Sequence, residues 1–380
     1  MALSGKVYGK DQFAVGIKQK NVTAFATPAS ASATYILLPV TEMSYPNITL
    51  VESGEIRTNN SGMIELKSDQ FRTRKGGSVT LDFEFPAERD LLSRLMASVM
   101  QDHTEDTTND PIIFHNHEAS SSETLVRPHL ATNASSSSAG VPSLFDIALY
   151  YPGSNENKLM TSAVVQSLTL SFDQADGRAL VSGTFYSGFA SDAGFKLEQN
   201  LTGNSGAPDV VPQTFVEAFF NSKTLDLDGS SDVVAPVITA FSFTINNNVT
   251  RVGRDANGDA EAYAFGIPNV EITGEISFLY DSTFAFGNAK NVMQDFLDGV
   301  PATLTLVQGD GDLSQGNRAL GELKITAEIY STAVNLENAE VGSVITLPFK
   351  VIQPINETTG DPSGTAFKFE IVDSKQNSTW

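Results

Sequence analysis

The feature that most restricts how this chain can fold is an internal repeat, because two similar stretches of sequence are expected to fold alike. Three identities recur with a constant spacing of 197 residues: Pro39-Val40 with Pro236-Val237, Arg57 with Arg254, and Gly77 with Gly274. A spacing kept through strand, loop and helix patterns is hard to obtain by chance. We infer that the chain contains two copies of one building block.

The repeat extends to the patterns expected of secondary structure. Apolar and polar residues alternate at 79–83 and again at 276–280, as in a strand with one buried face. The apolar residues of 95–100 and 292–297 have the spacing of one face of an amphipathic helix. Three later strand patterns also match, at smaller offsets: 145–150 with 303–307, 164–172 with 323–330, and 179–185 with 343–349.

The smaller offsets arise because the first copy has about 40 extra residues. This surplus, at about 102–141, is rich in Ser, Thr, Asn and acidic residues and is expected to be a polar surface insertion. We predict a mainly β protein with two tandem similar β-sandwich or barrel domains, each with one flanking helix. The first domain would cover 1–200 and the second 205–372, followed by a C-terminal tail at 373–380.

Composition argues against several classes of function. With 24 Lys and Arg against 45 Asp and Glu, the net charge of −21 opposes attraction to nucleic acids and to anionic membranes. The chain has no cysteine, so disulfides, thiolate metal sites and cysteine nucleophiles are ruled out. The first ten residues lack the pattern of a signal peptide, and no apolar stretch is long enough to span a bilayer. We expect no membrane partner.

Candidate catalytic and metal-binding motifs are weak. His115 and His117 could share a cation on one face of a strand, but no carboxylate has a diagnostic spacing to them, and a solvated loop is the preferred interpretation. The oxygen-rich segment 255–261 has its glycine too early for a calcium loop and is interpreted as a polar turn. Nucleophile-elbow, phosphate-loop and dinucleotide-binding patterns are absent. We therefore predict no catalytic residue, no metal, no cofactor and no enzymatic activity.

Four segments together resemble the tail tube proteins of long-tailed bacteriophages, especially the two-domain type of non-contractile tails. They are Tyr35–Val40, Glu52–Arg57, Gly77–Phe85 and Phe241–Asn247, and the resemblance covers most of the chain. It implies β-sandwich or barrel domains with a flanking helix, six to a ring, in rings that stack into a tube. Because each chain would supply two domains, three chains would form a homotrimeric, pseudo-hexameric ring.

The resemblance also implies a location and partners. The protein would be the major tail tube protein of a virion, assembled in the bacterial host cytoplasm. Its partners would be further copies of itself, the tail tip and tail terminator proteins, the tape measure protein in the lumen before ejection, and double-stranded DNA that passes through without specific binding. The insertion at about 102–141 is not recognised as an element of that family.

Two sets of residues are candidates for roles in such a tube. Polar residues opposite the core are expected to line the lumen, where a wall without basic groups lets DNA slide. These are Ser78, Thr80, Asp82, Glu84, Glu271, Thr273, Glu275 and Ser277. The long loops 52–70 and 247–267 are expected to make ring-to-ring contacts. Their candidates are Glu52, Glu55, Arg57, Arg251, Arg254, Asp255 and Asp259.

Three alternatives stay open. The chain could be the tube protein of a contractile tail, although the duplication favours a tail without a sheath. It could be a β-rich surface adhesion module, although the sequence has no signal peptide pattern. It could also be an enzyme that uses a metal at His115 and His117, which replacement of both residues and measurement of metal uptake would test.

Overall fold

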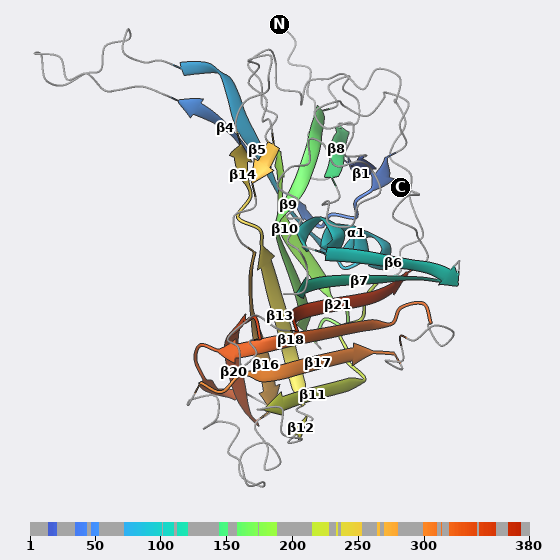
Figure 1. Ribbon diagram of the computed structural model, residues 1–380, viewed down its shortest axis with the longest axis vertical. Coiled ribbons are helices and arrows are strands. Elements are labelled where there is room, and N and C mark those ends of the chain that lie inside the picture. The colour runs from blue at the N-terminus through green and yellow to red at the C-terminus, as the bar shows by residue number, and fades with distance from the viewer. Residues whose placement is uncertain are drawn as a thin grey trace, which may run out of the picture.

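The computed structural model describes residues 14–20, 35–43, 47–52, 72–100, 102–109, 112–120, 144–150, 158–173, 175–187, 215–227, 233–234, 237–252, 264–266, 270–279, 299–309, 313, 319–339, 342–354 and 364–373. All structural statements below refer to these residues. This part of the chain folds almost entirely into antiparallel strands, with one α-helix (Figure 1). The predicted mainly β fold is confirmed.

The helix is α1 (Arg89–Val99). The strands of the first half are β1 (Ala14–Lys20), β2 (Ile36–Leu37), β3 (Glu42–Met43), β4 (Asn47–Glu52), β5 (Arg72–Pro86), β6 (Asp102–Asn109), β7 (Ile112–Ser120), β8 (Leu144–Tyr150), β9 (Lys158–Asp173) and β10 (Leu180–Ser187). Those of the second half are β11 (Ser222–Leu227), β12 (Val233–Val234), β13 (Ile238–Asn246), β14 (Thr250–Val252), β15 (Ala264–Gly266), β16 (Glu271–Leu279), β17 (Ala302–Gln308), β18 (Leu323–Ser331), β19 (Asn335–Ala339), β20 (Gly342–Val351) and β21 (Thr365–Asp373).

Eight strands form one continuous antiparallel sheet in the order β4-β5-β10-β9-β13-β16-β20-β19. We call it the long sheet. Its first four strands come from the first half of the chain and its last four from the second. The halves meet where β9 pairs with β13, from Asp173↔Ala240 to Ser167↔Asn246. The two halves are therefore joined by a backbone ladder.

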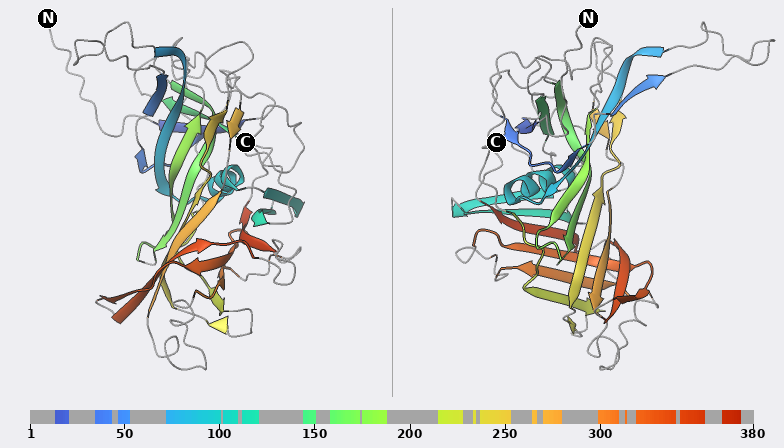
Figure 2. Two further views of the ribbon diagram at one scale, coloured as in Figure 1. Left: turned by 60° about the vertical axis from the view of Figure 1, so that its left-hand side comes forward. Right: turned by 180° about the vertical axis from the view of Figure 1, so that it is seen from behind.

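Further strands lie across the long sheet (Figures 1 and 2). One group follows the order β12-β11-β17-β18-β21-β7-β6, in which five strands of the second half are extended by β7 and β6 of the first half. In the first half the order is β2-β1-β8, and β8 pairs with the beginning of β9. The space between these strands and the long sheet is where apolar side chains gather.

The insertion at about 102–141 differs from the expectation of a polar surface loop. Residues 102–109 and 112–120 form the hairpin β6–β7, and β7 pairs with β21 near the end of the chain. His115 and His117 thus lie in a strand and not in a solvated loop, which corrects that interpretation. The polar composition hid the strand because β7 is stabilised by pairing with a segment some 250 residues later in the sequence. Residues 121–143 lie outside the described part.

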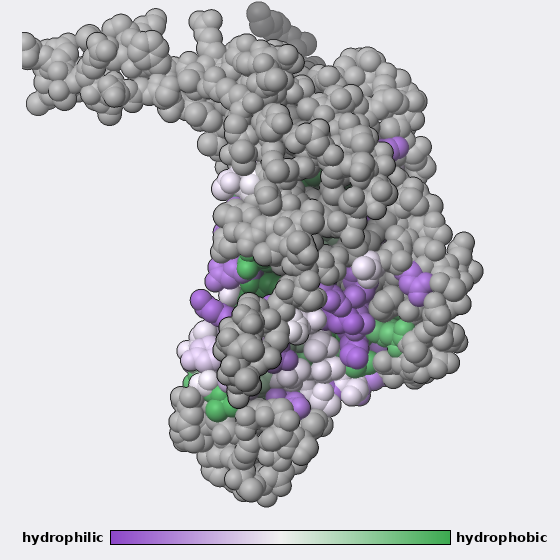
Figure 3. All heavy atoms as spheres, viewed as in Figure 1, coloured by the Kyte–Doolittle hydropathy of each residue, from purple (hydrophilic) through white to green (hydrophobic). Residues whose placement is uncertain are grey.

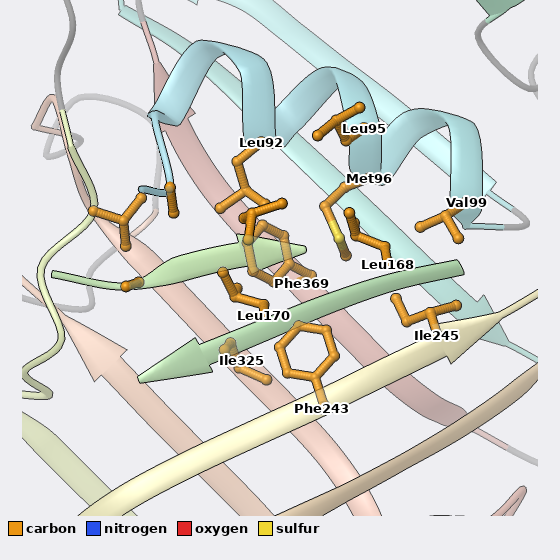
Figure 4. Packing of buried hydrophobic residues seen from close by; sticks show 14 of the residues in the cluster. Leu92, Leu95, Met96, Val99, Leu168, Leu170, Phe243, Ile245, Ile325 and Phe369 are labelled. Carbon is orange, nitrogen blue, oxygen red and sulfur yellow. The ribbon is translucent and has the colours of Figure 1, made fainter. Parts of the chain in front are cut away.

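One large apolar core runs through both halves, and a small separate cluster contains Tyr35, Ala148 and Leu159. Helix α1 begins after Glu88, whose carboxylate accepts a hydrogen bond of 2.9 Å from the Leu91 backbone N–H. Figure 4 shows its apolar residues directed toward side chains of the long sheet and of β18 and β21. They are Leu92, Leu95, Met96 and Val99, which lie near Leu168, Leu170, Phe243, Ile245, Ile325 and Phe369.

The helix predicted around 95–100 is therefore present, and it contributes to a core shared with the second half. The matching helix expected at 292–297 lies outside the described residues. The domain limits at 200 and 205 also fall outside them, so the division into two domains stays a prediction.

The strand pairings of the first half recur in the second. The arrangement β2-β1-β8 returns as β12-β11-β17, and β4-β5-β10 returns as β13-β16-β20. Matched rows of paired residues are Asn47-Thr80-Tyr186 and Thr244-Thr273-Lys350. In these rows Asn47 of β4 matches Thr244 of β13, which is the sequence offset of 197 residues. Thr80 of β5 matches Thr273 of β16, which is an offset of 193 residues. The shift of four residues preserves the buried and exposed faces of the strand.

A buried polar group supports the first half. The Asp146 side chain is fully buried and accepts hydrogen bonds from Thr161 Oγ1 at 2.7 Å and from the Ser162 N–H at 2.9 Å. Ser162 has a φ of 51°, in the left-handed region. Replacing Asp146 with Ala should lower the free energy of unfolding by about 3 kcal/mol, because buried donors lose their acceptor. Urea unfolding measures this; Asp146→Asn keeps one acceptor oxygen and should lose less, and an unchanged Asp146→Ala midpoint would contradict this role.

The joint between β7 and β21 carries a partly buried ion pair. Lys368 Nζ lies 3.0 Å from Glu370 Oε1 and 3.5 Å from Glu118 Oε1. Burial alone would lower the pKa of Lys368, but the hydrogen bonds and charges of Glu370 and Glu118 outweigh it and raise the pKa above 10.5. Glu118 also accepts a hydrogen bond of 2.8 Å from Asn116 Nδ2.

A raised lysine pKa stabilises the fold while the amine is charged in the folded state. Lys368→Met should therefore lower stability by about 1 kcal/mol at pH 7. The difference from wild type should shrink as the pH rises above 10.5 and the amine of the folded protein loses its proton. Unfolding midpoints measured from pH 7 to 12 test this, and a difference that grows at alkaline pH would refute the ion-pair role.

Candidate functional site: a polar sheet face with two open edges

One face of the long sheet carries mostly polar side chains across the strands from β5 to β20, where the structure describes them. In β5, Val79, Leu81, Phe83 and Phe85 are buried in the core, and the intervening residues lie on the opposite face. Strand β16 alternates in the same way. Both predicted lumen sets lie on this one face: Ser78, Thr80, Asp82, Glu84, Glu271, Thr273, Glu275 and Ser277, all half-buried or exposed.

The strands between these two carry further polar residues that the sequence interpretation missed. Cross-strand partners share a face, so the registers β5–β10, β10–β9, β9–β13 and β13–β16 extend the polar face. The added residues are Ser182, Thr184, Ser167, Thr169, Ser171, Ser242, Thr244 and Asn246. The alternation of Ser and Thr with Leu and Phe at 167–172 and 241–246 was the signal that could have identified them.

Hydrogen bonds between neighbouring strands satisfy many of these hydroxyls. Thr169 Oγ1 and Thr244 Oγ1 lie 2.8 Å apart across the joint between the two halves. Thr184 Oγ1 donates to Asp82 Oδ1 at 2.7 Å. Ser277 Oγ and Thr346 Oγ1 are 3.0 Å apart. Such pairs hold the hydroxyls along the sheet surface, and the result is an ordered polar surface with few groups free to grip a ligand.

The charge of the polar face is acidic. Asp82, Glu84, Glu271 and Glu275 lie on it, and Lys350 is the one cation among its residues whose side chains the structure describes. Lys350 Nζ lies 3.6 Å from Glu271 Oε1, with both side chains about half exposed. The lysine is therefore paired with a carboxylate of the same face. This charge distribution opposes the binding of phosphates.

The long sheet ends in two strands that each have one described neighbour. Strand β4 pairs with β5, and β19 pairs with β20; within the described residues neither has a partner on its other side. Unpaired N–H and C=O groups at such edges favour pairing with another strand. The polar face is thus bounded by two edges that can extend it.

The ring-contact candidates fall mostly outside the described residues: Glu55, Arg57, Arg254, Asp255 and Asp259. Glu52 ends β4, where it pairs with Arg72, and Arg251 lies in β14, where it pairs with Phe265. The loop 52–70 thus follows β4 in the hairpin β4–β5, whereas the segment 247–267, predicted as a loop, contains the strands β14 and β15. Both hairpins lie toward the same end of the molecule (Figure 1). The role of these residues stays a prediction.

Other kinds of site find little support in the described part of the chain. No three His, Asp or Glu side chains placed there gather as a metal site. No described helix is long and apolar enough to cross a membrane. Among the coloured residues of Figure 3, hydrophobic side chains appear in separate small areas.

These features define a class: a structural β protein whose distinctive surface is a wide polar sheet face between two strand edges. The comparison with protein families agrees, because a family model described as phage tail tube protein matches residues 19–351. A search of curated proteins gave no match. The chain belongs to the phage tail tube protein family. It is therefore a structural protein of a virion and has the role of a tail tube component.

Proposed function

We propose that three copies of this chain close into a ring, that rings stack into a tube, and that the polar face of the long sheet lines its lumen. The observation that carries this proposal is the continuity of the polar face across both halves, together with an edge strand at each end that has one partner among the described residues. A sheet whose two edges pair with those of its neighbours has no free edge left. Ring closure thereby removes the unpaired backbone groups of β4 and β19.

The joint within the chain is a template for the joint between chains. If the chain is a duplication, β13 corresponds to β4. The last part of β9 corresponds to β19, since β9 forms a hairpin with β10 as β19 does with β20. The pair Thr244 and Thr169 then corresponds to Asn47 of one chain and Asn335 of the next. Both asparagines lie at register positions of the polar face. The proposed contact therefore keeps that face continuous around the ring.

Three chains follow from the number of building blocks. Each chain supplies two similar four-stranded parts of the long sheet, so three chains supply six, the number that the resemblance to tail tubes implies. The true symmetry is threefold and the approximate symmetry sixfold. The hairpins β4–β5 and β14–β15 lie toward one end of the molecule, and in this proposal they contact the next ring.

The chemistry of the lumen suits the passage of double-stranded DNA. Phosphates bind where Lys and Arg displace counterions, and each such contact adds affinity and salt dependence. A wall of hydroxyls and carboxylates, with Lys350 held by Glu271, offers little of this attraction. DNA and the tape measure protein can therefore move along the tube. Tail tip and tail terminator proteins would contact the rings at the two ends of a non-contractile tail.

A lysine in the middle of the polar face tests this role. Ser242 is half-buried, lies opposite Ser171 and Glu275, and would appear three times in each ring. Phages carrying Ser242→Lys should eject DNA at least about tenfold more slowly at low salt, with recovery as salt rises, because phosphate contacts are screened. Ser242→Gln is the control of similar reach without charge. Equal ejection by both variants would argue against a lumen position.

A further inference from the structure

We propose that Phe219 and Leu320 form a docking surface for the β4–β5 hairpin of a second copy of this chain in the next ring. We call these two residues the end patch. Phe219 is 48% exposed and Leu320 is 53% exposed, although both are large hydrophobic residues. The inference rests on the proposed function, because it needs stacked rings, and it names the surface that receives the neighbouring ring.

Phe219 lies at the end of β5 that is away from the β4–β5 hairpin. Its segment, 215–221, runs beside the residues that follow β5 and those that precede β10. The Val216 N–H donates to the Ala87 C=O at 2.8 Å, and the Ala179 N–H donates to the Val216 C=O at 2.9 Å. Figure 1 shows β11, which follows this segment, and the β4–β5 hairpin at opposite ends of the molecule.

The backbone of this segment is fixed, so the outward position of Phe219 is built into the fold. Buried and exposed side chains alternate along 215–220: Val216, Ala218 and Phe220 are buried, whereas Glu217 and Phe219 are exposed. Phe220 packs in the core, with its ring centroid 4.8 Å from that of Phe172. Phe219 therefore occupies an outward position at which a polar residue would be expected.

Leu320 adjoins the same segment. The Gly309 N–H donates to Asn221 Oδ1 at 3.0 Å, which joins the end of β17 to the residues after Phe219. A Cβ at Gly309 would lie 2.7 Å from Cγ of Glu322, so the turn that contains Leu320 adjoins this junction. Two exposed hydrophobic side chains thus belong to neighbouring segments at one end of the long sheet.

A single exposed hydrophobic side chain is common on a protein surface, but a group of them marks a contact with another molecule. Three of the four large hydrophobic side chains exposed in the described part of the chain lie at this end. The third is Val237, which directly precedes β13, at the end of that strand away from β14. This end of the molecule is therefore the one whose surface needs a cover.

A second copy of the chain fits as the occupant because stacking brings opposite ends together. In a stack of identical rings related by a translation and a rotation, the hairpin end of one ring faces the other end of the next. The segment 52–75, which leads from the end of β4 into β5, contains apolar residues that could cover the end patch. They are Ile56, Met63, Ile64, Leu66 and Phe71.

The charges of the two ends are complementary. Strand β5 begins at the hairpin end with three basic residues among its first four, Arg72, Arg74 and Lys75. At the other end, the Ala218 N–H donates to the Gly177 C=O at 3.3 Å, which places the turn 173–177 beside the segment of Phe219. The exposed carboxylates there are Asp173, Asp176 and Glu217. A hairpin that docks on the end patch would bring its basic residues toward these carboxylates.

The test places a photo-crosslinking phenylalanine that carries a benzophenone group at position 219 of the full-length protein in phage tails. After irradiation, a denaturing gel should show covalent dimers, and mass spectrometry should locate the attachment within residues 52–75 of the other chain. The same probe at position 242, on the polar face, is the matched control and should give no dimer. The proposal is overturned if position 219 gives no dimer, or links to another segment or to another protein.

A second measurement asks whether the end patch drives stacking. The double variant Phe219→Ser and Leu320→Ser should raise the protein concentration needed for tubes by at least about thirtyfold, because large desolvated side chains dominate the affinity of a contact. Phe219→Leu with Leu320→Met keeps the surface apolar and should change this concentration by less than about threefold.

Sedimentation velocity separates this inference from the proposed function. Rings of the serine variant should form as those of the wild type do, while negative-stain microscopy shows few tubes. Tubes at the wild-type concentration would overturn the docking role, and so would a loss of rings confined to the serine variant, since the patch would then act within a ring. Failure of the wild-type chain to form rings would count against the proposed function itself.

Discussion

Replacing Leu336 and Asn338 with proline is expected to prevent rings and tubes from forming while the chain stays folded. Ala339 and Gly342 are the last pair of the β19–β20 ladder, and two residues separate them in the sequence. The alternation of an antiparallel ladder then directs the N–H groups of Leu336 and Asn338 away from β20, toward the open edge. Proline removes these donors without breaking the pairing inside the chain.

The size of the effect follows from the groups left unpaired. Each missing donor leaves a buried carbonyl of the neighbouring chain unsatisfied, at a cost of about 1–3 kcal/mol. Two such losses weaken each joint by about a hundredfold or more. The measurement is sedimentation velocity with negative-stain microscopy over a range of concentrations.

The matched control is the double variant Leu336→Ala and Asn338→Ala, which changes the same side chains but keeps both N–H groups. It should assemble nearly as well as the wild type. Normal tubes from the proline variant would rule out β19 as the joining edge, and loss of assembly in both variants would show that side chains, not the backbone edge, carry the contact.

The second large effect is expected in the core, for Gly274→Val. Gly274 in β16 lies opposite Phe243 on one side and Phe349 on the other. A Cβ at this position would collide with the ring of Phe349 and with the backbone oxygen of Ser242. Because a backbone atom cannot move aside as a side-chain end can, the strands must separate locally. We expect a loss of about 4 kcal/mol or more, seen as insolubility or a much lower urea midpoint.

Thr273→Val is the control for this prediction, because it places valine at the adjacent residue on the polar face, where a branched side chain of the same size already fits. Its effect should be within about 1 kcal/mol. Equal stability of Gly274→Val and wild type would show that the close approach of Phe349 is not required. Gly183 in β10 lies opposite Phe83 in the same manner and should respond like Gly274.

The parts of the fold that depend on local pattern could be predicted from the sequence. Alternation at 79–83 and 276–280 predicted strands with the correct buried face as far as the described residues reach, to Leu279 in β16. The apolar spacing at 95–100 falls in α1, which ends at Val99. The lumen candidates follow from the same alternation, and they lie on one face because β9 and β13 join the halves in register. The pairing of β9 with β13 joins residues far apart in the sequence, and no local sequence pattern predicts it.

The parts that depend on distant partners were missed for the same reason. Residues 112–120 contain polar residues and two histidines, and they form a strand because β21 lies beside them. The polar residues of β10 and β9 were overlooked because only the strands of the matched repeat segment were considered. The paired rows give an offset of 193 and not 197 between β5 and β16. The alternation pattern could not reveal this difference, because a shift by an even number of residues leaves the same side chains on the buried face.

The most direct test of the central claim, a ring of three chains joined by β4 and β19, is disulfide cross-linking of the variant Asn47→Cys with Asn335→Cys. The natural chain has no cysteine, so it contributes no background. The control variant Thr169→Cys with Thr244→Cys places both cysteines across the β9–β13 pairing of one chain. It should form a disulfide within the chain and should therefore run as a monomer. On a non-reducing denaturing gel, the oxidised Asn47/Asn335 variant should show dimer and trimer bands that stop at trimer. Monomer alone, or a ladder that continues past trimer, would contradict the account.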